Sequence, residues 1–262
     1  MLIGTMNHPS RDIFEEMQWM ADLGLDFIDM TLEPPSNASW MVDTERVRAA
    51  LEKHRFQIVG HTPFYLPMAS AMEDVRKGAV AELRRCLRVF SELGAKWMNI
   101  HPDHYTPFHD RAFFVKRNIE SLTELREDSE KYGVGLMIEN LPGNFNNAQQ
   151  MGDLLDPLPW LGLHLDFGHS NLLVPRNSAQ EMLERYGSRL RHVHVHDNKG
   201  GSEDLHLPLG VGNIEVGAIV RELKQCHYDG TITLEVFTPD RHFLTYSADV
   251  LRKAWKDGAA AA

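Results

Sequence analysis

The sequence predicts a single closed (β/α)8 barrel. Strand-like and helix-like segments alternate from one end of the 262-residue chain to the other, which gives eight strand–helix pairs. No linker rich in Pro, Gly or Ser divides these pairs into two units. An open doubly wound sheet is the alternative, but no strand is followed by a GxGxxG or GxxxxGK[ST] phosphate turn. We therefore expect one α/β domain, a TIM barrel, over residues 1–257.

The first four pairs follow from short apolar runs and from apolar residues that recur at the helical period. Ile13, Met17, Met20 and Leu23 recur near a 3.6-residue period after Ser10 and Asp12, two candidate N-caps. Glycines after the helical segments are typical C-caps. Strands are expected at 2–5, 27–32, 57–60 and 97–100, and helices at 11–23, 44–54, 73–93 and 111–132.

The last four pairs follow the same pattern. Strands are expected at 134–138, 161–165, 190–195 and 231–234, and helices at 147–155, 178–186, 215–226 and 242–255. The Ala-rich end at 258–262 is expected to be a disordered or artificial tail.

Composition excludes several classes of protein. The net charge of −10 argues against a nucleic-acid partner, because contacts to phosphates need Lys and Arg. No apolar run approaches the roughly 18 residues that a membrane span needs. The first residues lack the basic and then apolar pattern of a secretory signal. Cys86 and Cys226 both fall in helical patterns, which predicts reduced, packed thiols and a cytoplasmic location.

His, Asp and Glu, the residue types that commonly bind metals, cluster at the ends of the expected strands, where the active sites of barrel enzymes lie. In the stretch 191–199, Val193 and Val195 point one way while three histidines point the other, as the period of a strand requires. The strand ends supply Glu33, His61, His101, Glu139, Asp166, His194 and Glu235, and the loops that follow supply His169, Asp204 and His206.

Four of these residues are carboxylates that would crowd at one mouth: Glu139, Asp166, Asp204 and Glu235. Like charges within a few Å raise pKa values and cost stability unless cations offset them. Carboxylates together with imidazoles suit Zn, Mn, Fe or Co better than Ca, and no cysteine lies nearby to make a thiolate zinc site. The sequence therefore predicts a divalent metal at the mouth.

Seven motifs resemble the xylose isomerase-like barrels, a superfamily of sugar isomerases, sugar epimerases and apurinic endonucleases of the endonuclease IV type. They are HTPF at 61–64, IHP at 100–102, IEN at 138–140, LDFGH at 165–169, HVHDNK at 194–199, DLHLPLGVGNI at 204–214, and LE at 234–235. The resemblance covers essentially the whole chain. It is more specific for the superfamily than for the reaction.

The resemblance also implies ligand sets. In the isomerases and epimerases one metal is held by residues that match Glu139, Asp166, His194 and Glu235, and the residue matching His169 contacts substrate. The endonucleases hold three zinc ions with five further ligands, which match His61, His101, His169, Asp204 and His206. One to three ions are therefore compatible with the sequence. His192 and His196 match no ligand, and we expect them to have structural or supporting roles.

The first functional hypothesis is isomerisation or epimerisation of a small sugar, sugar phosphate or keto-polyol. The metal would chelate a carbonyl and the adjacent hydroxyl, and Glu139 and Glu235 would act as base and acid through an enediolate. His169 and Lys199 are expected to hold substrate oxygens. The expected wall of the pocket is Phe64, Tyr65, Phe108, Phe145 and Phe237.

The second hypothesis is metal-dependent hydrolysis of a phosphodiester at an abasic site in DNA, which the nine-ligand match favours. The loops at 34–43 and 62–71 contain no Lys or Arg to hold DNA, so we favour the first hypothesis. A third class, a metal-stabilised binding protein without turnover, stays open. The oligomeric state also stays open, although many barrels of this kind pair into homo-oligomers.

Overall fold

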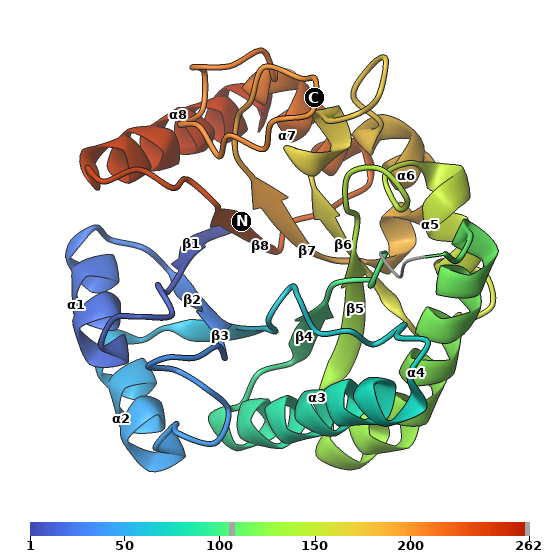
Figure 1. Ribbon diagram of the computed structural model, residues 1–262. Helices are drawn as coiled ribbons and strands as arrows, with labels where there is room; N and C mark the ends of the chain where they lie inside the picture. Colours follow the sequence, from blue (N-terminus) through green and yellow to red (C-terminus); the bar gives the residue numbers. More distant parts are fainter. Residues whose placement is uncertain (105–107, 260–262) are drawn as a thin grey trace.

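The eight strands close into one parallel barrel in the order β1 to β8 (Figure 1). The computed structural model describes residues 1–104 and 108–259. The strands are β1 Leu2–Met6, β2 Phe27–Thr31, β3 Gln57–His61, β4 Trp97–Ile100, β5 Gly135–Glu139, β6 Gly162–Asp166, β7 Leu190–Val195 and β8 Thr231–Leu234. Since β8 pairs with β1, the ring has no free edge, and the predicted fold class is confirmed.

Helices surround the ring on its outer side (Figure 1). They are α1 Ile13–Asp22, α2 Thr44–His54, α3 Glu73–Leu93, α4 Arg111–Tyr132, α5 Ala148–Leu155, α6 Ala179–Tyr186, α7 Val216–Gln225 and α8 His242–Ala259, with short 3-10 turns at His169–Asn171 and Gly187–Arg189. These bounds lie within a few residues of those expected. Asp12 is the N-cap of α1, and its carboxylate accepts from the Phe14 and Glu15 amides.

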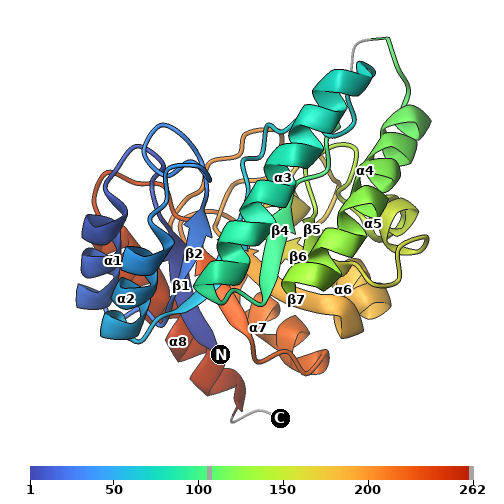
Figure 2. The same ribbon diagram turned by 90° about the horizontal axis from the view of Figure 1, so that it is seen from below.

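Helix α8 includes Gly258 and Ala259, the first two residues of the expected tail, while 260–262 lie outside the described residues. The N-terminus and the last turn of α8 lie at the end of the barrel where β1 begins (Figure 2). No helix of the described ranges has the length and apolar character that a membrane crossing requires. Cys86 and Cys226 are both free thiols, as expected.

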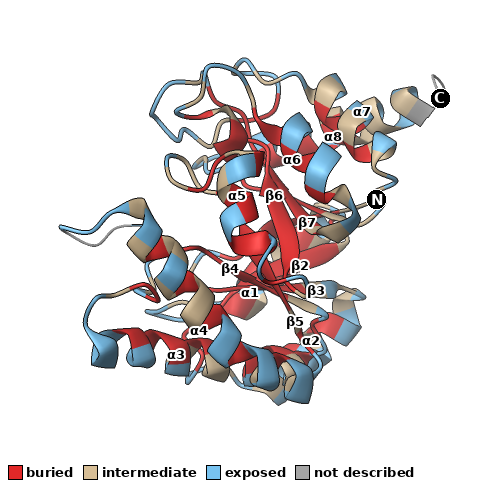
Figure 3. Ribbon diagram, turned by 90° about the vertical axis from the view of Figure 1, so that its right-hand side faces the viewer, coloured by how far each residue is buried: buried red, intermediate tan, exposed pale blue. Residues whose placement is uncertain are grey.

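The strands and the inner faces of the helices are the buried parts of the chain (Figure 3), and the apolar core that they form has two parts. One part fills the space between sheet and helices, and the other is a small cluster of Phe27, Val59 and Met137 with Leu2 and Trp97 packed against it. The side chains of this cluster fill the interior of the barrel at the amino ends of the strands. Above it the interior becomes polar, with Asp29, His164 and His192 fully buried. The fold therefore places a closed apolar floor under a polar mouth.

Candidate metal centre

The carboxyl ends of the strands bring the predicted ligand residues together. Glu139 and Asp166 are the last residues of β5 and β6, His194 is the fifth residue of β7, and Glu235 directly follows β8. All four are buried. Because parallel strands of one barrel end at one rim, residues distant in sequence converge there.

His194 occupies the centre of this group. Its Nδ1 lies 3.3 Å from Glu235 Oε2, 3.8 Å from Asp166 Oδ2 and 3.9 Å from Glu139 Oε1. Its other ring nitrogen, Nε2, donates to Asp29 Oδ2 at 2.7 Å. In the neutral ring this hydrogen bond leaves a lone pair on Nδ1 that faces three carboxylate oxygens, whereas in the protonated ring Nδ1–H donates to Glu235 Oε2 at 3.3 Å.

The carboxylates around His194 Nδ1 favour a positive charge at this nitrogen. Burial lowers the pKa of His194, but Glu235, Asp29 and Glu139 outweigh it and hold the pKa well above its ordinary value. Burial raises the pKa of Glu139, yet His164 and His101 keep it well below its usual range. The Glu139 carboxylate is therefore ionised, and either a proton on His194 or a metal ion compensates its charge.

A divalent cation fits this arrangement. Asp166 Oδ2 is buried without any hydrogen-bond partner among the described residues, although it faces His194 Nδ1. A cation bound by Glu139, Asp166, His194 and Glu235 would satisfy that oxygen and take the place of the proton on His194. The carboxylate behind His194 is the partner that ligand histidines usually have in metal sites.

A second group lies on the β3 and β4 side of the centre. His101 Nε2 is 3.0 Å from Glu139 Oε2, and the His101 ring centroid is 4.9 Å from that of His61. The His61 ring stacks on His194 at 5.4 Å, and its Nδ1 lies 3.6 Å from Asp29 Oδ1. His61, His101 and Glu139 together form one of the groups that could hold an ion.

A third group lies on the β6 and β7 side. Asp204 Oδ2 is 3.2 Å from His169 Nε2 and 3.1 Å from His206 Nε2. Burial raises the pKa of Asp204, but these two histidines outweigh it and hold the pKa far below its usual value. His206 has φ +44, a left-handed conformation that costs a non-glycine residue about 1–3 kcal/mol and is typical of functional positions.

Some expected site residues lie elsewhere. Glu33 follows β2 by two residues, faces Tyr65 and forms no ion pair with the described histidines. Phe145 is fully buried in the core and cannot line a pocket. The expectations for these two residues were therefore wrong. Strand β2 ends at Thr31, so Glu33 lies in the loop beyond the strand end. The loop that carries Phe145 packs this ring into the core.

The remaining expected contacts of substrate lie at the rim. Phe237 is 59% exposed and stacks on the His206 ring at 4.4 Å, so it borders the third group. Phe64 is also exposed and contacts Tyr65 edge-on, while Phe108 is fully exposed. The side chain of Lys199 is exposed and forms no ion pair in the described part of the chain.

Sequence reasoning missed several buried residues that support the centre: Asp29, Asn99, His164 and Thr233. Asn99 Nδ2 donates to Glu139 Oε2 at 2.6 Å, and Thr233 Oγ1 donates to Asp29 Oδ2 at 2.9 Å. A sequence signal for such residues was available: a polar residue two positions before a predicted ligand lies on the same face of the strand as that ligand. Asn99 before His101 and His164 before Asp166 are examples. The ring nitrogens of His192 lie 2.7 Å from Thr231 Oγ1 and 2.9 Å from Thr233 Oγ1, and its structural role stays a prediction.

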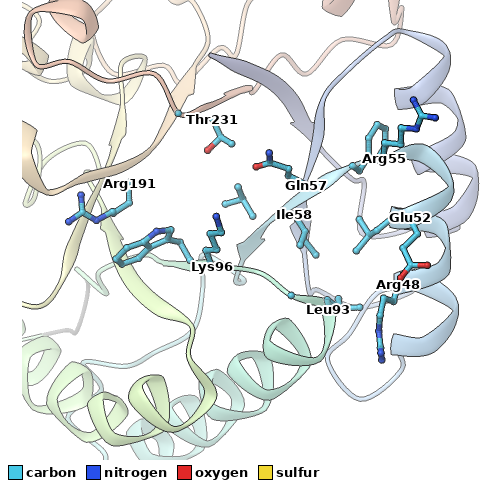
Figure 4. Close-up of a pocket in the computed structure, with 15 residues that line it drawn as sticks. Arg48, Glu52, Arg55, Gln57, Ile58, Leu93, Lys96, Arg191 and Thr231 are labelled. Atoms are coloured by element: carbon cyan, nitrogen blue, oxygen red, sulfur yellow. The ribbon is translucent and has the colours of Figure 1, made fainter.

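A cavity of about 700 Å³ lies at the opposite end of the barrel, among the starts of β3, β4 and β8 (Figure 4). Gln57, Lys96, Arg191 and Thr231 surround it. Catalytic groups of barrel enzymes lie at the carboxyl ends of the strands, so this cavity is not the candidate active site.

Sequence comparisons agree with this geometry. A family model described as xylose isomerase-like TIM barrel matches residues 17–260. MJ1311, an uncharacterized protein of Methanocaldococcus jannaschii, is 29% identical over 77% of this chain and 69% of its own length. Fructoselysine 3-epimerase of Escherichia coli O157:H7 is 24% identical over 74% and 73%, respectively. The Aquifex aeolicus protein named "Probable endonuclease 4" is 23% identical over 98% of both chains.

Solved structures give the same fold. A D-tagatose 3-epimerase-like protein has a TM-score of 0.90 and 24% identity, covering 99% of each chain. IOLI protein, solved with a binding zinc atom, has a TM-score of 0.76 and 17% identity, covering 99% of this chain and 96% of its own. At these identities the likeness establishes the barrel fold.

Proposed function

The chain belongs to the xylose isomerase-like TIM barrel family, and from that premise we propose that it isomerises or epimerises a small sugar, sugar phosphate or keto-polyol. The reaction is a metal-dependent proton transfer through an enediolate of the substrate. The observation that carries the proposal is the position of His194 Nδ1 among oxygens of Glu139, Asp166 and Glu235. The sugar epimerases among similar proteins support the same reaction class.

Glu139 and Glu235 are the proposed base and acid. They come from β5 and β8, on either side of β7 with its His194, so their carboxylates approach the mouth from different directions. One carboxylate removes the proton from the carbon beside the carbonyl, and the other returns a proton. When bound by Glu139, Asp166, His194 and Glu235, a divalent cation polarises the substrate carbonyl and hydroxyl, which acidifies that carbon.

The remaining groups orient the carboxylates and exclude water. Asn99 Nδ2 and His101 Nε2 hold Glu139 Oε2, at 2.6 and 3.0 Å, so that Oε1 faces His194. His169 Nδ1 lies 2.9 Å from the Asn140 carbonyl oxygen, which aims Nε2 toward the mouth, where it can hold a substrate oxygen. Glu139 and Asp166 are almost completely buried, so their charges act in a medium that screens them weakly.

The test is incorporation of deuterium from heavy water into a panel of ketoses by the metal-loaded protein. Glu139→Gln and Glu235→Gln should each abolish incorporation while leaving the circular dichroism spectrum unchanged. Glu33→Gln is the matched control, because Glu33 also follows a strand but lies outside the centre, and it should retain exchange. Retained exchange in both Gln variants of the centre would refute their acid–base roles.

Phosphodiester hydrolysis is the second candidate function, because all nine family ligand positions lie in contiguous groups around the mouth. The loops after β2 and β3 oppose it, since their exposed side chains Trp40, Met41, Phe64 and Tyr65 carry no positive charge to neutralise phosphates. Nicking of an abasic-site duplex that stops on addition of chelator, with no exchange in any ketose, would favour hydrolysis. Metal binding with neither activity would favour a binding protein.

A further inference from the structure

We propose that the cavity at the amino ends of β3, β4 and β8 binds a small organic phosphate, of the size of a sugar phosphate or a nucleoside monophosphate. The candidate metal centre lies at the opposite end of the barrel, and the apolar cluster of Phe27, Val59 and Met137 separates the two. A ligand in this cavity would therefore act apart from the reacting atoms, whichever reaction the protein catalyses.

The cavity lies where two neighbouring strands separate. Within the described ranges, β3 pairs with β2 at five positions and β4 pairs with β5 at four, but β3 and β4 pair only at Gly60 and Met98. Paired strands lie about 4.7–4.9 Å apart, and pairing along their whole length would close this part of the wall. Gln57 and Ile58 line the cavity from β3 and Trp97 lines it from β4, so it opens between these two strand starts.

The charges around the cavity favour an anion. Its described lining contains four cations and one carboxylate, on a chain whose net charge is −10: Arg48, Arg55, Lys96 and Arg191 against Glu52. None of the four cations forms an ion pair with a carboxylate in residues 1–104 and 108–259. Several arginines on α3 and α4, in contrast, are paired with acidic side chains. Unpaired cations around a hollow concentrate anions there, because its low-dielectric walls focus their field.

The side chains at the centre of the opening can hold a phosphate group. Figure 4 shows Gln57 and Lys96 pointing into the space between the strand starts, with Arg48, Arg55 and Arg191 around its edge. The Lys96 ammonium provides three N–H donors and a point charge, and the Gln57 amide provides two more donors. Both side chains are exposed, so a ligand can reach them. The guanidinium groups at the edge can each approach the same anion with two parallel N–H donors.

The size of the cavity and its apolar wall indicate an organic ligand rather than a bare anion. The cavity volume of about 700 Å³ lies in the range of roughly 300–1,000 Å³ that small-molecule sites occupy. Leu51, Phe56, Ile58 and Leu93 line its side toward α2 and α3. A free phosphate would leave this apolar wall without a contact, whereas a sugar or nucleobase attached to the phosphate would cover it.

The ligand would connect separate parts of the barrel. Arg48 lies in α2 and Arg55 directly follows it, Lys96 directly precedes β4, and Arg191 belongs to β7. A phosphate held among these cations would bridge the gap between β3 and β4. Because such a ligand binds the folded chain and not the unfolded one, binding should raise the Tm in proportion to ligand concentration on a logarithmic scale.

Titration calorimetry of the metal-loaded full-length protein tests the site with ribose 5-phosphate, adenosine monophosphate and inorganic phosphate. At least one organic phosphate should bind and raise the Tm, and the one that binds more tightly identifies the organic part of the ligand. Inorganic phosphate should bind about tenfold more weakly, because it makes no apolar contact. Lys96→Gln removes a charged donor and Gln57→Glu adds a repelling carboxylate, so each should weaken binding of the organic phosphate by roughly 10–100-fold.

Two matched variants locate the ligand. Lys53→Gln removes a cation of α2 whose ammonium donates to Gln18 Oε1 at 3.2 Å, outside the cavity, and it should keep the wild-type affinity. Lys199→Gln removes a cation at the mouth and should also keep it. Loss of binding in Lys199→Gln without loss in Lys96→Gln would place the probe at the metal centre and overturn the proposal.

A variant that should gain affinity guards against misfolding. Glu52→Gln removes the carboxylate that borders the cavity, and binding should tighten by roughly threefold to tenfold, because a like charge is lost. Three results would each overturn the proposal: no binding of either organic phosphate at millimolar concentration, equal affinity for inorganic phosphate, or unchanged affinity in Lys96→Gln, Gln57→Glu and Glu52→Gln. Every measurement is of binding, so failure of the proposed epimerase function alone does not affect the outcome.

Discussion

Replacing Asp29 should weaken metal binding at His194 while leaving the barrel folded. Asp29 is fully buried in β2, and its Oδ2 accepts from His194 Nε2 at 2.7 Å and from Thr233 Oγ1 at 2.9 Å. It therefore fixes the tautomer that directs the lone pair of Nδ1 at the metal position.

The magnitude follows from what each substitution removes. Loss of the partner behind a ligand histidine costs about 10–100-fold in metal affinity, or about 1.4–2.8 kcal/mol. Asp29→Asn keeps an oxygen that can accept from His194 but removes the charge, so we expect a loss near 10-fold. Asp29→Ala removes the acceptor as well, and we expect a loss near 100-fold.

Competition against a chromophoric chelator measures these affinities, and thermal unfolding of the metal-free protein checks the fold. Asp26→Asn is the control, because Asp26 Oδ2 accepts from the Ile3 amide and, within residues 1–104 and 108–259, from no other group, and it lies far from the mouth. If both Asp29 variants bind metal as tightly as wild type and Asp26→Asn, His194 does not depend on Asp29 and the argument fails.

Three further predictions concern pH, the loop after β7 and the barrel packing. Burial lowers the pKa of His194, but Glu235 and other carboxylates raise it well above about 6.5. This proton stabilises the metal-free protein fully below about pH 6.5, and the stabilisation is lost as pH rises through the raised value. Metal affinity should increase over that window with proton release, and calorimetry in two buffers that shows no release would contradict this. The Asp197 carboxylate accepts hydrogen bonds from the backbone N–H groups of 198, 210, 212 and 214. Asp197→Asn should leave two of these donors facing the side-chain NH2 group, which costs roughly 1–3 kcal/mol for each. Amide hydrogen exchange at 205–214 should therefore accelerate. Gly60→Ala should destabilise by about 1–3 kcal/mol in urea unfolding, because its Cβ would lie 2.7 Å from the buried Phe90 ring, and equal midpoints would exclude that clash.

Much of the fold could be predicted from the sequence because its signals are local. Apolar periods of 2 and 3.6 distinguish strands from helices, and glycines such as Gly94 and Gly133 end α3 and α4 in left-handed conformations. The nine family ligand positions could be placed because closure of the barrel brings strand ends to one rim. That these residues bind metal stays a prediction.

Other features could not be read from the sequence. Both faces of a barrel strand are buried, so β2 reads as a run of buried residues and gives no sign that Asp29 points inward. Phe145 precedes a helix as a rim residue would, but its loop packs into the core.

The sequence by itself determined the order of strands and helices and the kinds of side chain that meet at the mouth. Only the tertiary structure decided which ring nitrogen of His194 faces Glu139, Asp166 and Glu235, which residue supports it, and that His196 lies buried with its Nε2 3.3 Å from Asp166 Oδ1. The physical reason is that the orientation of a histidine ring depends on partners from distant strands, as the ring of His194 in β7 depends on Asp29 in β2. These partners become neighbours only when the barrel closes.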